Sequence, residues 1–295
     1  MANNAELKDR VREFWQQHPC GTKFSDAAMG SREFFERVEA HRYEKEWHIP
    51  AAANFAASGG LKVLEIGCGM GTDGAQFARA GAEYTGIDLT EAAVDLARRR
   101  FALSGLPGEF RVSDAENLDF SDESFDLVYS HGVLHHTPDI DAAVREIHRV
   151  LKPGGRAMVM LYHRGSYNYR VGIRVLRRAG AGLLKSESGI KLVHQLTGEP
   201  IDSLREHAAS LKNANGDFSA AELLNQSTDG AGNPLARVYS RREARDLFRD
   251  FRQVELRAYF LNKRFIPIVG NLLPRSIESA LASRWGWHLW IYATK

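Results

Sequence analysis

The chain has 295 residues, of which 44% are hydrophobic and 26% are charged. These values are ordinary for a globular protein and exclude disordered, collagen-like and coiled-coil classes, and the length fits one large domain with an insertion. The formal net charge of +2 gives no electrostatic reason to expect a nucleic acid partner. We therefore predict no DNA binding, and RNA binding is disfavoured.

The cysteines and the N-terminal residues indicate the compartment. Only Cys20 and Cys68 are present, too few for a disulfide framework, which favours a reduced intracellular setting. The N-terminal residues lack the apolar segment and the cleavage pattern of a secretory signal, and no run of about eighteen apolar residues occurs. We expect a cytoplasmic protein.

Two helices are predicted before the first strand. Apolar residues recur at helical spacing in 5–18 and again in 31–48. Because both helices precede the sheet, we assign residues 1–60 to an N-terminal helical lid added to the core. Trp15 and Trp47 suit ordinary packing on these helices, or alternatively a lid over the turn that follows the first strand.

Residues 61–163 alternate between short apolar runs, which predict strands, and amphipathic segments, which predict helices. Lys152–Gly155 is predicted to end the last of these helices. The alternation predicts an α/β fold with a doubly wound, mostly parallel sheet and ligands at the C-terminal strand ends. The predicted strands are 61–66, 83–87, 108–112, 125–129 and 156–162, and the predicted helices are 72–80, 93–101 and 139–151.

Residues 239–295 are predicted to complete the core sheet. A helix runs from a cap at Ser240 to Phe251, a strand follows at 253–260, and the alternating run 286–293 is a closing strand. The sheet therefore has seven strands. Two insertions interrupt it, at 164–238 and at 262–285, and the first leaves the sheet at a C-terminal strand end.

The turn after the first strand contains two overlapping glycine patterns. Gly69, Gly71 and Gly74 fit G-x-G-x-x-G, the dinucleotide fingerprint, with Asp88 at a distance suited to a ribose. The pattern that directly follows the strand is instead G-x-G-x-G, which begins at Gly67. Glu65, just before this turn, would face the phosphates of a dinucleotide, so it favours a ligand with a positive group.

The ordered motifs V-L-E-I-G-C-G-M-G and T-G-I-D-L resemble those of class I S-adenosylmethionine-dependent methyltransferases. The resemblance continues through S-D-A-E-N-L, F-D-L-V-Y-S, L-H-H and L-K-P-G-G, and covers 61–162 closely and 240–293 more loosely. It is greatest for the branch of ubiquinone- and menaquinone-type C-methyltransferases and small-molecule enzymes. It implies a Rossmann-like methyltransferase fold, S-adenosyl-L-methionine as cofactor and a cofactor-binding core at 61–163.

The resemblance also implies which residues hold the methionine part of the cofactor. Gly67 and Gly69 would admit it to the backbone, with Cys68 between them in the same turn. Glu65 would neutralise its ammonium, directly or through water. The backbone of Ser130 and His131, at the end of the fourth strand, would also bind this part of the cofactor.

The adenosine part would lie along the next strand ends. By the same resemblance, Asp88 would accept both ribose hydroxyls, because a carboxylate offers two oxygens to two donors. Leu89 would pack on the adenine, Asp114 would accept from its exocyclic amine, and the backbone of Ala115 would meet the ring edge. Any one of these aspartates could be a turn or cap residue, but their placement at successive strand ends favours the ligand role.

His135 and His136 are the catalytic candidates, because the L-H-H motif lies where the acceptor should meet the cofactor. A base that removes the acceptor proton contributes typically about 10²–10⁴-fold. A structural or lid role fits the two histidines equally well, and His131, Tyr162 and His163 are further candidates for a base. His131, His135 and His136 lack a carboxylate pair, so we predict no metal site.

The 164–238 insertion should shape the pocket of the methyl acceptor. Arg170, Arg174, Arg177 and Arg178 recur at helical spacing, which suits a solvated face or a surface for anionic substrates or lipid headgroups. The apolar segment 264–274 would suit an apolar acceptor, a peripheral membrane contact or core packing. We predict a small-molecule methyltransferase. The alternatives are an RNA or lipid methyltransferase, a dehydrogenase, and a nucleotide- or NAD-binding protein without transfer activity.

Overall fold

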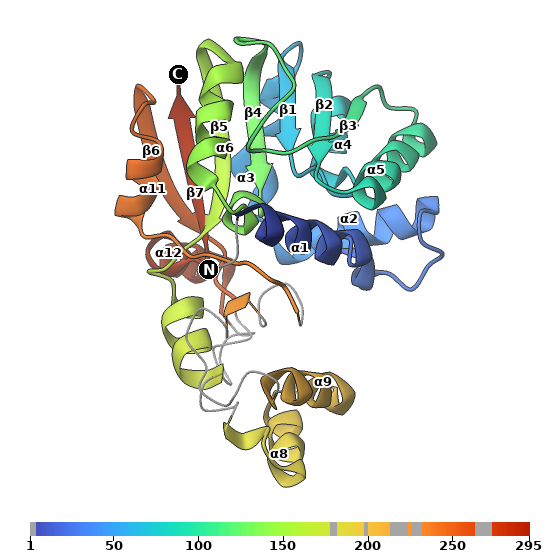
Figure 1. The fold of residues 1–295 in the computed structure, drawn as a ribbon, viewed down its shortest axis with the longest axis vertical. Helices are drawn as coiled ribbons and strands as arrows, with labels where there is room; N and C mark the ends of the chain where they lie inside the picture. Colours follow the sequence, from blue (N-terminus) through green and yellow to red (C-terminus); the bar gives the residue numbers. More distant parts are fainter. Residues whose placement is uncertain (1–3, 178–181, 198–199, 213–223, 226–231, 263–272) are drawn as a thin grey trace.

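The computed structural model describes residues 4–177, 182–197, 200–212, 224–225, 232–262 and 273–295 (Figure 1). Its first half contains α1 (Asn4–Gln17), η1 (Thr22–Phe24), α2 (Arg32–Lys45), α3 (Ile49–Ala53), η2 (Phe55–Ser58), β1 (Lys62–Ile66), α4 (Thr72–Arg79), β2 (Glu83–Asp88), α5 (Glu91–Ser104), β3 (Glu109–Val112), β4 (Phe125–His131), η3 (Leu134–His136) and α6 (Ile140–Val150). Then follow β5 (Leu151–Tyr162), η4 (Asn168–Arg177), α8 (Glu187–Thr197), α9 (Ile201–Lys212), α11 (Arg241–Leu247), β6 (Gln253–Tyr259), α12 (Arg275–Trp285) and β7 (His288–Thr294).

The seven strands form one sheet in the order β3-β2-β1-β4-β5-β7-β6. The strands from β3 to β5 are parallel to their neighbours, whereas β7 is antiparallel to both β5 and β6. The predicted fold class, a doubly wound seven-stranded and mostly parallel sheet, is confirmed. The strand order reverses between β1 and β4, and a ligand crevice is expected at their C-terminal ends.

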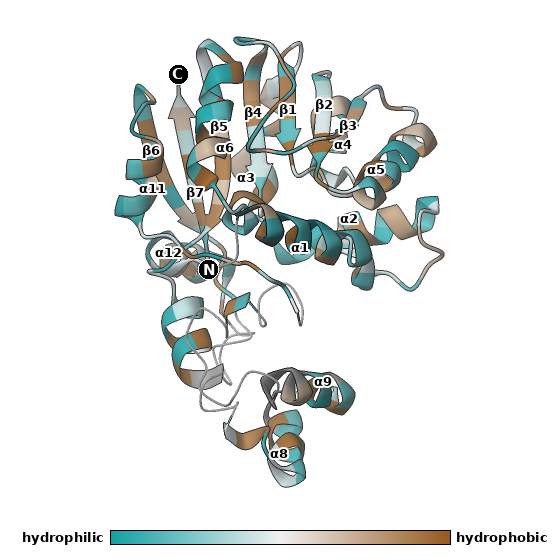
Figure 2. Ribbon diagram, viewed as in Figure 1, coloured by the Kyte–Doolittle hydropathy of each residue, from teal (hydrophilic) through white to brown (hydrophobic). Residues whose placement is uncertain are grey.

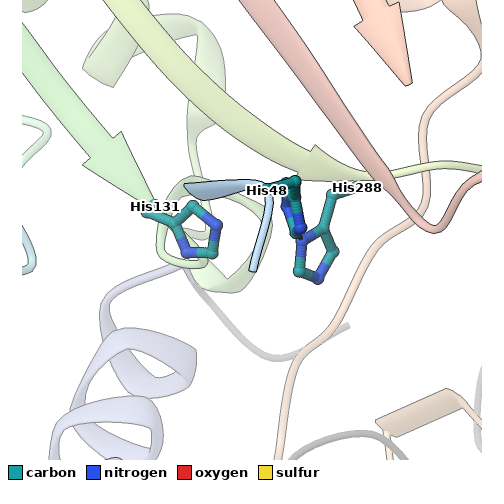
Figure 3. A group of neighbouring side chains, drawn as sticks. All are labelled: His48, His131 and His288. Carbon is teal, nitrogen blue, oxygen red and sulfur yellow. Dashed lines mark hydrogen bonds between the residues drawn. The ribbon is translucent and has the colours of Figure 1, made fainter. Parts of the chain in front are cut away.

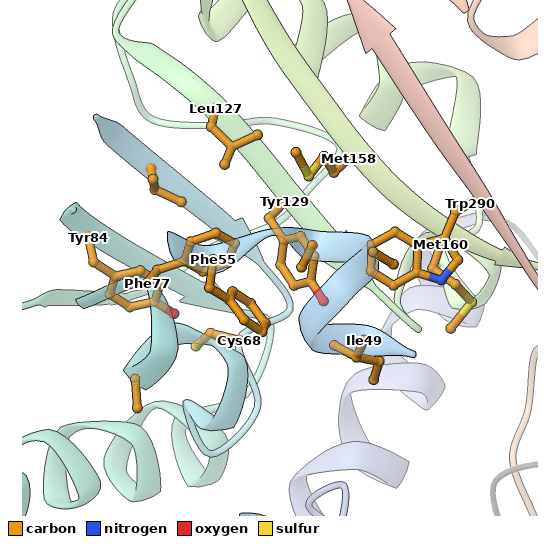
Figure 4. Close-up of a cluster of buried hydrophobic side chains, with 14 of the residues drawn as sticks. Ile49, Phe55, Cys68, Phe77, Tyr84, Leu127, Tyr129, Met158, Met160 and Trp290 are labelled. Atoms are coloured by element: carbon orange, nitrogen blue, oxygen red, sulfur yellow. The ribbon is translucent and has the colours of Figure 1, made fainter. Parts of the chain in front are cut away.

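Alternating side chains bury both faces of this sheet. Val63 on β1 joins a cluster with residues of α3, α4 and α5, and aromatic rings such as Phe77 and Tyr129 fill it (Figure 4). The next residue, Leu64, belongs to the opposite cluster, which contains residues of α6 and α11. Strands covered on both faces read as nearly continuous apolar runs, which is why the sequence predicted them well. Figure 2 shows the hydrophobic strands enclosed by helices with hydrophilic outer faces.

Two elements differ from the predictions. Lys152–Gly155 does not separate α6 from β5 but belongs to β5, which begins at Leu151. A register shift follows the Phe125–Leu151 pair, and Gly154, at a φ of 78°, donates its backbone N–H to the carbonyl of Lys295. The second predicted insertion contains α12, which packs along β6.

The first insertion contains η4, α8 and α9, and Figure 1 shows α8 and α9 beyond the C-terminal edge of the sheet. These two helices pack together through Ile190, Leu204 and Ala208. Arg170 and Arg174 are exposed on η4, while Arg178 and most of segment 264–274 lie outside the described residues. Within the described ranges, no helix combines the length and apolarity needed to cross a membrane.

Candidate functional site

A cavity of roughly 1360 Å³ lies at the C-terminal ends of β1, β2, β3 and β4. Residues of α1 and α2 also line it, and Figure 1 shows both helices crossing this edge of the sheet. Ligand pockets commonly enclose about 300–1,000 Å³, so this space is large enough for two ligands side by side. The two N-terminal helices thus lie where the sequence placed a lid.

The glycine turn after β1 brings bare backbone to this cavity. The N–H groups of Gly67 and Cys68 both donate to the Ile87 carbonyl, at 2.8 and 2.9 Å, which fixes the turn against β2. Gly67 has a φ of 73°, and a Cβ there would lie 2.1 Å from Val133. Gly69, with a φ of 52°, has no atom within 4 Å of its Cβ position, so its open side is available to a ligand.

Asp88, at the end of β2, is held in place before any ligand arrives. Its Oδ2 accepts from the Gly69 N–H at 3.1 Å, and its Oδ1 accepts from the N–H and hydroxyl of Thr90 at 3.0 and 2.9 Å. Burial raises the pKa of Asp88, although these hydrogen bonds act to lower it. Asp88 and its neighbour Leu89 both line the cavity, and because Oδ1 already accepts two hydrogen bonds, Oδ2 is the oxygen that retains a lone pair for a further donor.

Asp114 and Ala115 line the same cavity one strand further along. Lys8 of α1 forms ion pairs with Asp114 and Glu116, both at 2.5 Å. The sequence did not predict Lys8 or Glu116, and nothing local to Lys8 signals a partner more than a hundred residues away. These pairs hold the N-terminal helix over the end of β3.

Glu65 is 4% exposed and accepts the Tyr84 hydroxyl at 2.6 Å. Burial and the nearby charge of Asp73 raise the pKa of Glu65 well above its usual value. A positive group bound beside Glu65 would favour its ionised form again. The structure therefore places Glu65 beside the turn in a setting where its charge depends on the ligand.

A buried polar cluster next to Glu65 was not predicted from the sequence. Asp73 accepts from Arg42 Nε and Nη2 at 2.9 and 2.6 Å and from the hydroxyls of Tyr43 and Tyr129, both at 2.9 Å. Burial opposes ionisation of Asp73, but Arg42 and these donors bring its pKa below the usual value. Arg42 lines the cavity, so a guanidinium lies at the end opposite Asp114.

The two predicted residues at the end of β4, Ser130 and His131, have different surroundings. Ser130 is 1% exposed, and its hydroxyl donates to the Ile66 carbonyl at 3.1 Å, so the side chain joins β4 to β1. His131 lines the cavity, and its Nδ1 accepts from Arg42 Nη2 at 3.2 Å. The predicted backbone contacts of both residues with a cofactor stay a prediction.

The two candidate bases also occupy different positions. His135 is fully buried against Tyr162, with ring centroids 3.7 Å apart, and is not among the described residues that line the cavity. His136 does line it, beside Trp15, and its Nδ1 is hydrogen-bonded to the Leu235 carbonyl. Because a carbonyl only accepts, Nδ1 carries the proton and Nε2 is the basic nitrogen. The geometry favours His136 over His135 as a base.

Part of the cavity wall is apolar and aromatic. Tyr162 and Trp287 stack at 4.3 Å, and Met160, Ile173 and Leu261 line the same region. Arg170 and Arg174 are not among the described lining residues, so these two members of the predicted basic row do not line the described part of the cavity. An apolar ligand would fit here.

Residues 64–159 match the family described as "Methyltransferase domain". The phthiotriol/phenolphthiotriol dimycocerosates methyltransferase of Mycobacterium leprae is 35% identical over 169 residues, which are 52% of this chain and 61% of that protein. The fatty-acid O-methyltransferase of Mycolicibacterium smegmatis is 39% identical over 122 residues, which are 41% of this chain and 43% of that protein. The chain thus spans less than two thirds of the length of these relatives.

Two solved structures share the fold. A 1,6-didemethyltoxoflavin-N1-methyltransferase of Burkholderia thailandensis, with bound 1,6-didemethyltoxoflavin and S-adenosylhomocysteine, has a TM-score of 0.52 at 17% identity. That match covers 100% of this chain and 91% of the other. A SAM-dependent methyltransferase from Methanosarcina mazei has a TM-score of 0.50 at 21% identity, over 83% of this chain and 97% of the other.

Proposed function

We propose that this chain, which matches a methyltransferase domain over residues 64–159, is a class I, S-adenosylmethionine-dependent methyltransferase and methylates a small, largely apolar acceptor. One observation carries the proposal. The open backbone at Gly69 and the carboxylates of Asp88 and Asp114 line one cavity, in the order that the parts of the cofactor require. The apolar region beside His136 then provides room for the acceptor.

Each part of the cofactor has a matching group in this cavity. Asp114 and the backbone of Ala115 would bind the adenine, and Oδ2 of Asp88 would accept a ribose hydroxyl with an orientation already fixed by Gly69 and Thr90. The guanidinium of Arg42, at the far end, suits the carboxylate of the methionine part.

The acceptor is proposed from the cavity wall and from the relatives. Tyr162, Trp287 and Met160 offer aromatic and apolar contact area and few charges. The two curated relatives above are named for fatty acids and for phthiotriol dimycocerosates. We propose that the acceptor here is likewise a lipid-like molecule, with one nucleophilic oxygen at the end that reaches the cofactor.

The cofactor supplies an activated methyl group on a sulfonium. The chain's part is to align the acceptor oxygen with that methyl carbon, which is worth about 7–11 kcal/mol when the geometry is right. With the cofactor bound, the acceptor oxygen would take its methyl group and leave the sulfur as a neutral thioether, and Nε2 of His136 would take the proton of an acceptor that arrives protonated. Trp15 and the rest of α1 cover this region and would exclude water from it.

Calorimetry and a transfer assay test this proposal. The purified protein should bind S-adenosylhomocysteine and fail to bind NAD, and it should move labelled methyl from S-adenosylmethionine to fatty acids or long-chain alcohols. Binding of NAD alone would overturn the cofactor assignment in favour of a dehydrogenase or nucleotide-binding protein. Tight binding of S-adenosylhomocysteine with transfer only to RNA would overturn the acceptor class alone.

A further inference from the structure

Three histidines that are far apart in the sequence converge in the fold (Figure 3), and two of them, His131 and His288, line the cavity. His48 precedes α3, His131 ends β4, and His288 begins β7. One ring nitrogen from each lies within 4.8 Å of the other two. Within the described ranges, this is the one group of three or more histidine, cysteine or acidic side chains that is arranged to hold a metal ion.

Sheet topology explains the convergence. Because β7 is antiparallel, its first residue lies at the edge where the parallel strands end, opposite Tyr162 of β5. His131 pairs with Met160 at the same edge, so the two histidines lie on strands that both flank β5. The segment between α2 and α3 then adds His48 from the N-terminal helices. The prediction of no metal site considered His131, His135 and His136. The fold instead brings His131 together with His48 and His288.

The ring nitrogens already face one another. His288 Nδ1 lies 3.2 Å from His48 Nε2, and a carboxylate oxygen of Glu46 lies 3.6 Å behind, at His288 Nε2. His131 uses Nδ1 for Arg42, and its Nε2 is buried with no hydrogen-bond partner within the described part of the chain. A histidine backed by a carboxylate is the usual arrangement of a metal ligand.

The guanidinium nearest the three rings is itself ion-paired. Arg42 is paired with Asp73 at 2.6 Å and with Glu46 at 3.2 Å, so two carboxylates offset the positive charge that would oppose a cation. His48 and His288 are buried and His131 is half-buried, so the group is largely enclosed by protein.

We propose that His48, His131 and His288 bind a divalent transition-metal ion of the zinc type, with one coordination position open to the cavity. Three histidines with an open position form a known kind of catalytic zinc site, and imidazole nitrogen suits zinc, copper and nickel. His131 and His288 line the cavity, so the open position would face the acceptor region. The ion would bind there without the methyl donor, so this inference is independent of the proposed reaction.

Occupation of the site by a metal ion would break one hydrogen bond, the bond from Arg42 to His131. Coordination through Nε2 of His131 places the ring proton on Nδ1, which can then no longer accept from Arg42. Arg42 would withdraw from the ring and keep its bonds to Asp73 and Glu46. Metal binding would therefore reposition the guanidinium at the end of the cavity opposite Asp114.

The test uses the full-length protein, stripped with a chelator and then incubated with Zn²⁺ alone. We expect a single ion per chain after gel filtration, measured by elemental analysis, and a tetrahedral Co²⁺ spectrum when cobalt replaces zinc. H48Q and H288Q should weaken zinc affinity about tenfold or more, and E46Q, which removes the carboxylate behind His288, about 10–100-fold. The matched control is H148Q, because His148 lies on α6 against Phe251, away from the cluster.

Circular dichroism of each variant separates loss of a ligand from loss of the fold. If a histidine variant fails to fold, the cobalt spectrum of the unaltered protein and the E46Q affinity decide the question. The proposal is overturned if the unaltered protein retains no more zinc than H48Q, or if zinc binds equally to the unaltered protein and E46Q. In that case His48 and His288 form only a hydrogen-bonded pair.

Discussion

Asp88 has three donors from its own neighbours, and these orient its carboxylate toward the cavity without help from a ligand. We predict that Asp88→Ala weakens binding of S-adenosylhomocysteine by about 1.5–3 kcal/mol, because hydrogen bonds to a charged group are lost. Calorimetry measures the change. Asp95→Ala is the matched control, since Asp95 is a 73% exposed aspartate on the next helix. Equal affinity of the two variants would contradict the ribose contact.

His136 lines the cavity, and Nε2 is its basic nitrogen because the Leu235 carbonyl fixes the proton on Nδ1. We predict that His136→Gln lowers kcat by about 10²–10⁴-fold if the acceptor arrives protonated. The affinity for S-adenosylhomocysteine, measured in parallel, should stay within a factor of about two, because the ring lies on the acceptor side. A loss of cofactor affinity equal to the loss of rate would show that His136 supports the cofactor site instead.

Residues within a local motif could be predicted from the sequence, whereas residues recruited from a distance could not. Gly69 and Asp88 belong to motifs that follow strands, and both line the cavity. Arg42 reaches Asp73 and His131 across 31 and 89 positions, and His48 reaches His288 across 240. Nothing in the sequence around these residues specifies such partners, because the fold brings them together only after the sheet has formed.

Among the elements, α1 is held by Lys8, whose side chain is 21% exposed, over the Asp114 end of the cavity, where we propose that the adenine binds. We predict that Lys8→Met raises the dissociation rate of S-adenosylhomocysteine about twofold to fivefold, since partly exposed ion pairs are worth about 0.2–1 kcal/mol. Stopped-flow fluorescence measures the rate. Lys62→Met is the control, because Lys62 is 53% exposed and pairs with Glu83, at the other end of β1.

Some helices and strands could be located from the sequence more accurately than others. The buried strands were predicted to within about two residues because apolar runs flanked by glycine are distinctive. The start of β5 was missed because Pro153 and two glycines normally end an element, yet here the sheet continues through them. The helix α12 was missed because its buried residues are few, with Glu278 and Ala282 among the described ones.

For the molecule as a whole, buried histidines predict sensitivity to acid. Burial lowers the pKa of His48 to about 3, and also lowers the pKa of His131, His135 and His288 well below its usual value. Below about pH 6.5 the unfolded chain takes up protons on these groups and the folded chain does not. As the pH is lowered below about 6.5, the free energy of unfolding should therefore decrease by about 1.4 kcal/mol per pH unit for each histidine.

Urea unfolding at about pH 7.5 and about pH 5.5 tests this expectation. Carboxyl groups with raised pKa values, such as Glu65 and Asp88, act in the opposite direction, so the informative quantity is a difference between variants. His48→Gln should lose about 1.4 kcal/mol less than the unaltered protein over this interval. An identical loss in both proteins would mean that His48 takes up its proton over the same pH range in the folded and unfolded states.

The antiparallel strand β7 lies between β5 and β6, although both of its neighbours are made before it. While the ribosome is still adding residues near 288, β6 has no partner and the outer edge of β5 exposes unpaired backbone groups. Such an edge can pair with another nascent chain, so a pause in translation at this point carries a risk of aggregation. When β7 pairs with β5 and β6, it covers the exposed edge of β5 and also brings His288 to the cavity.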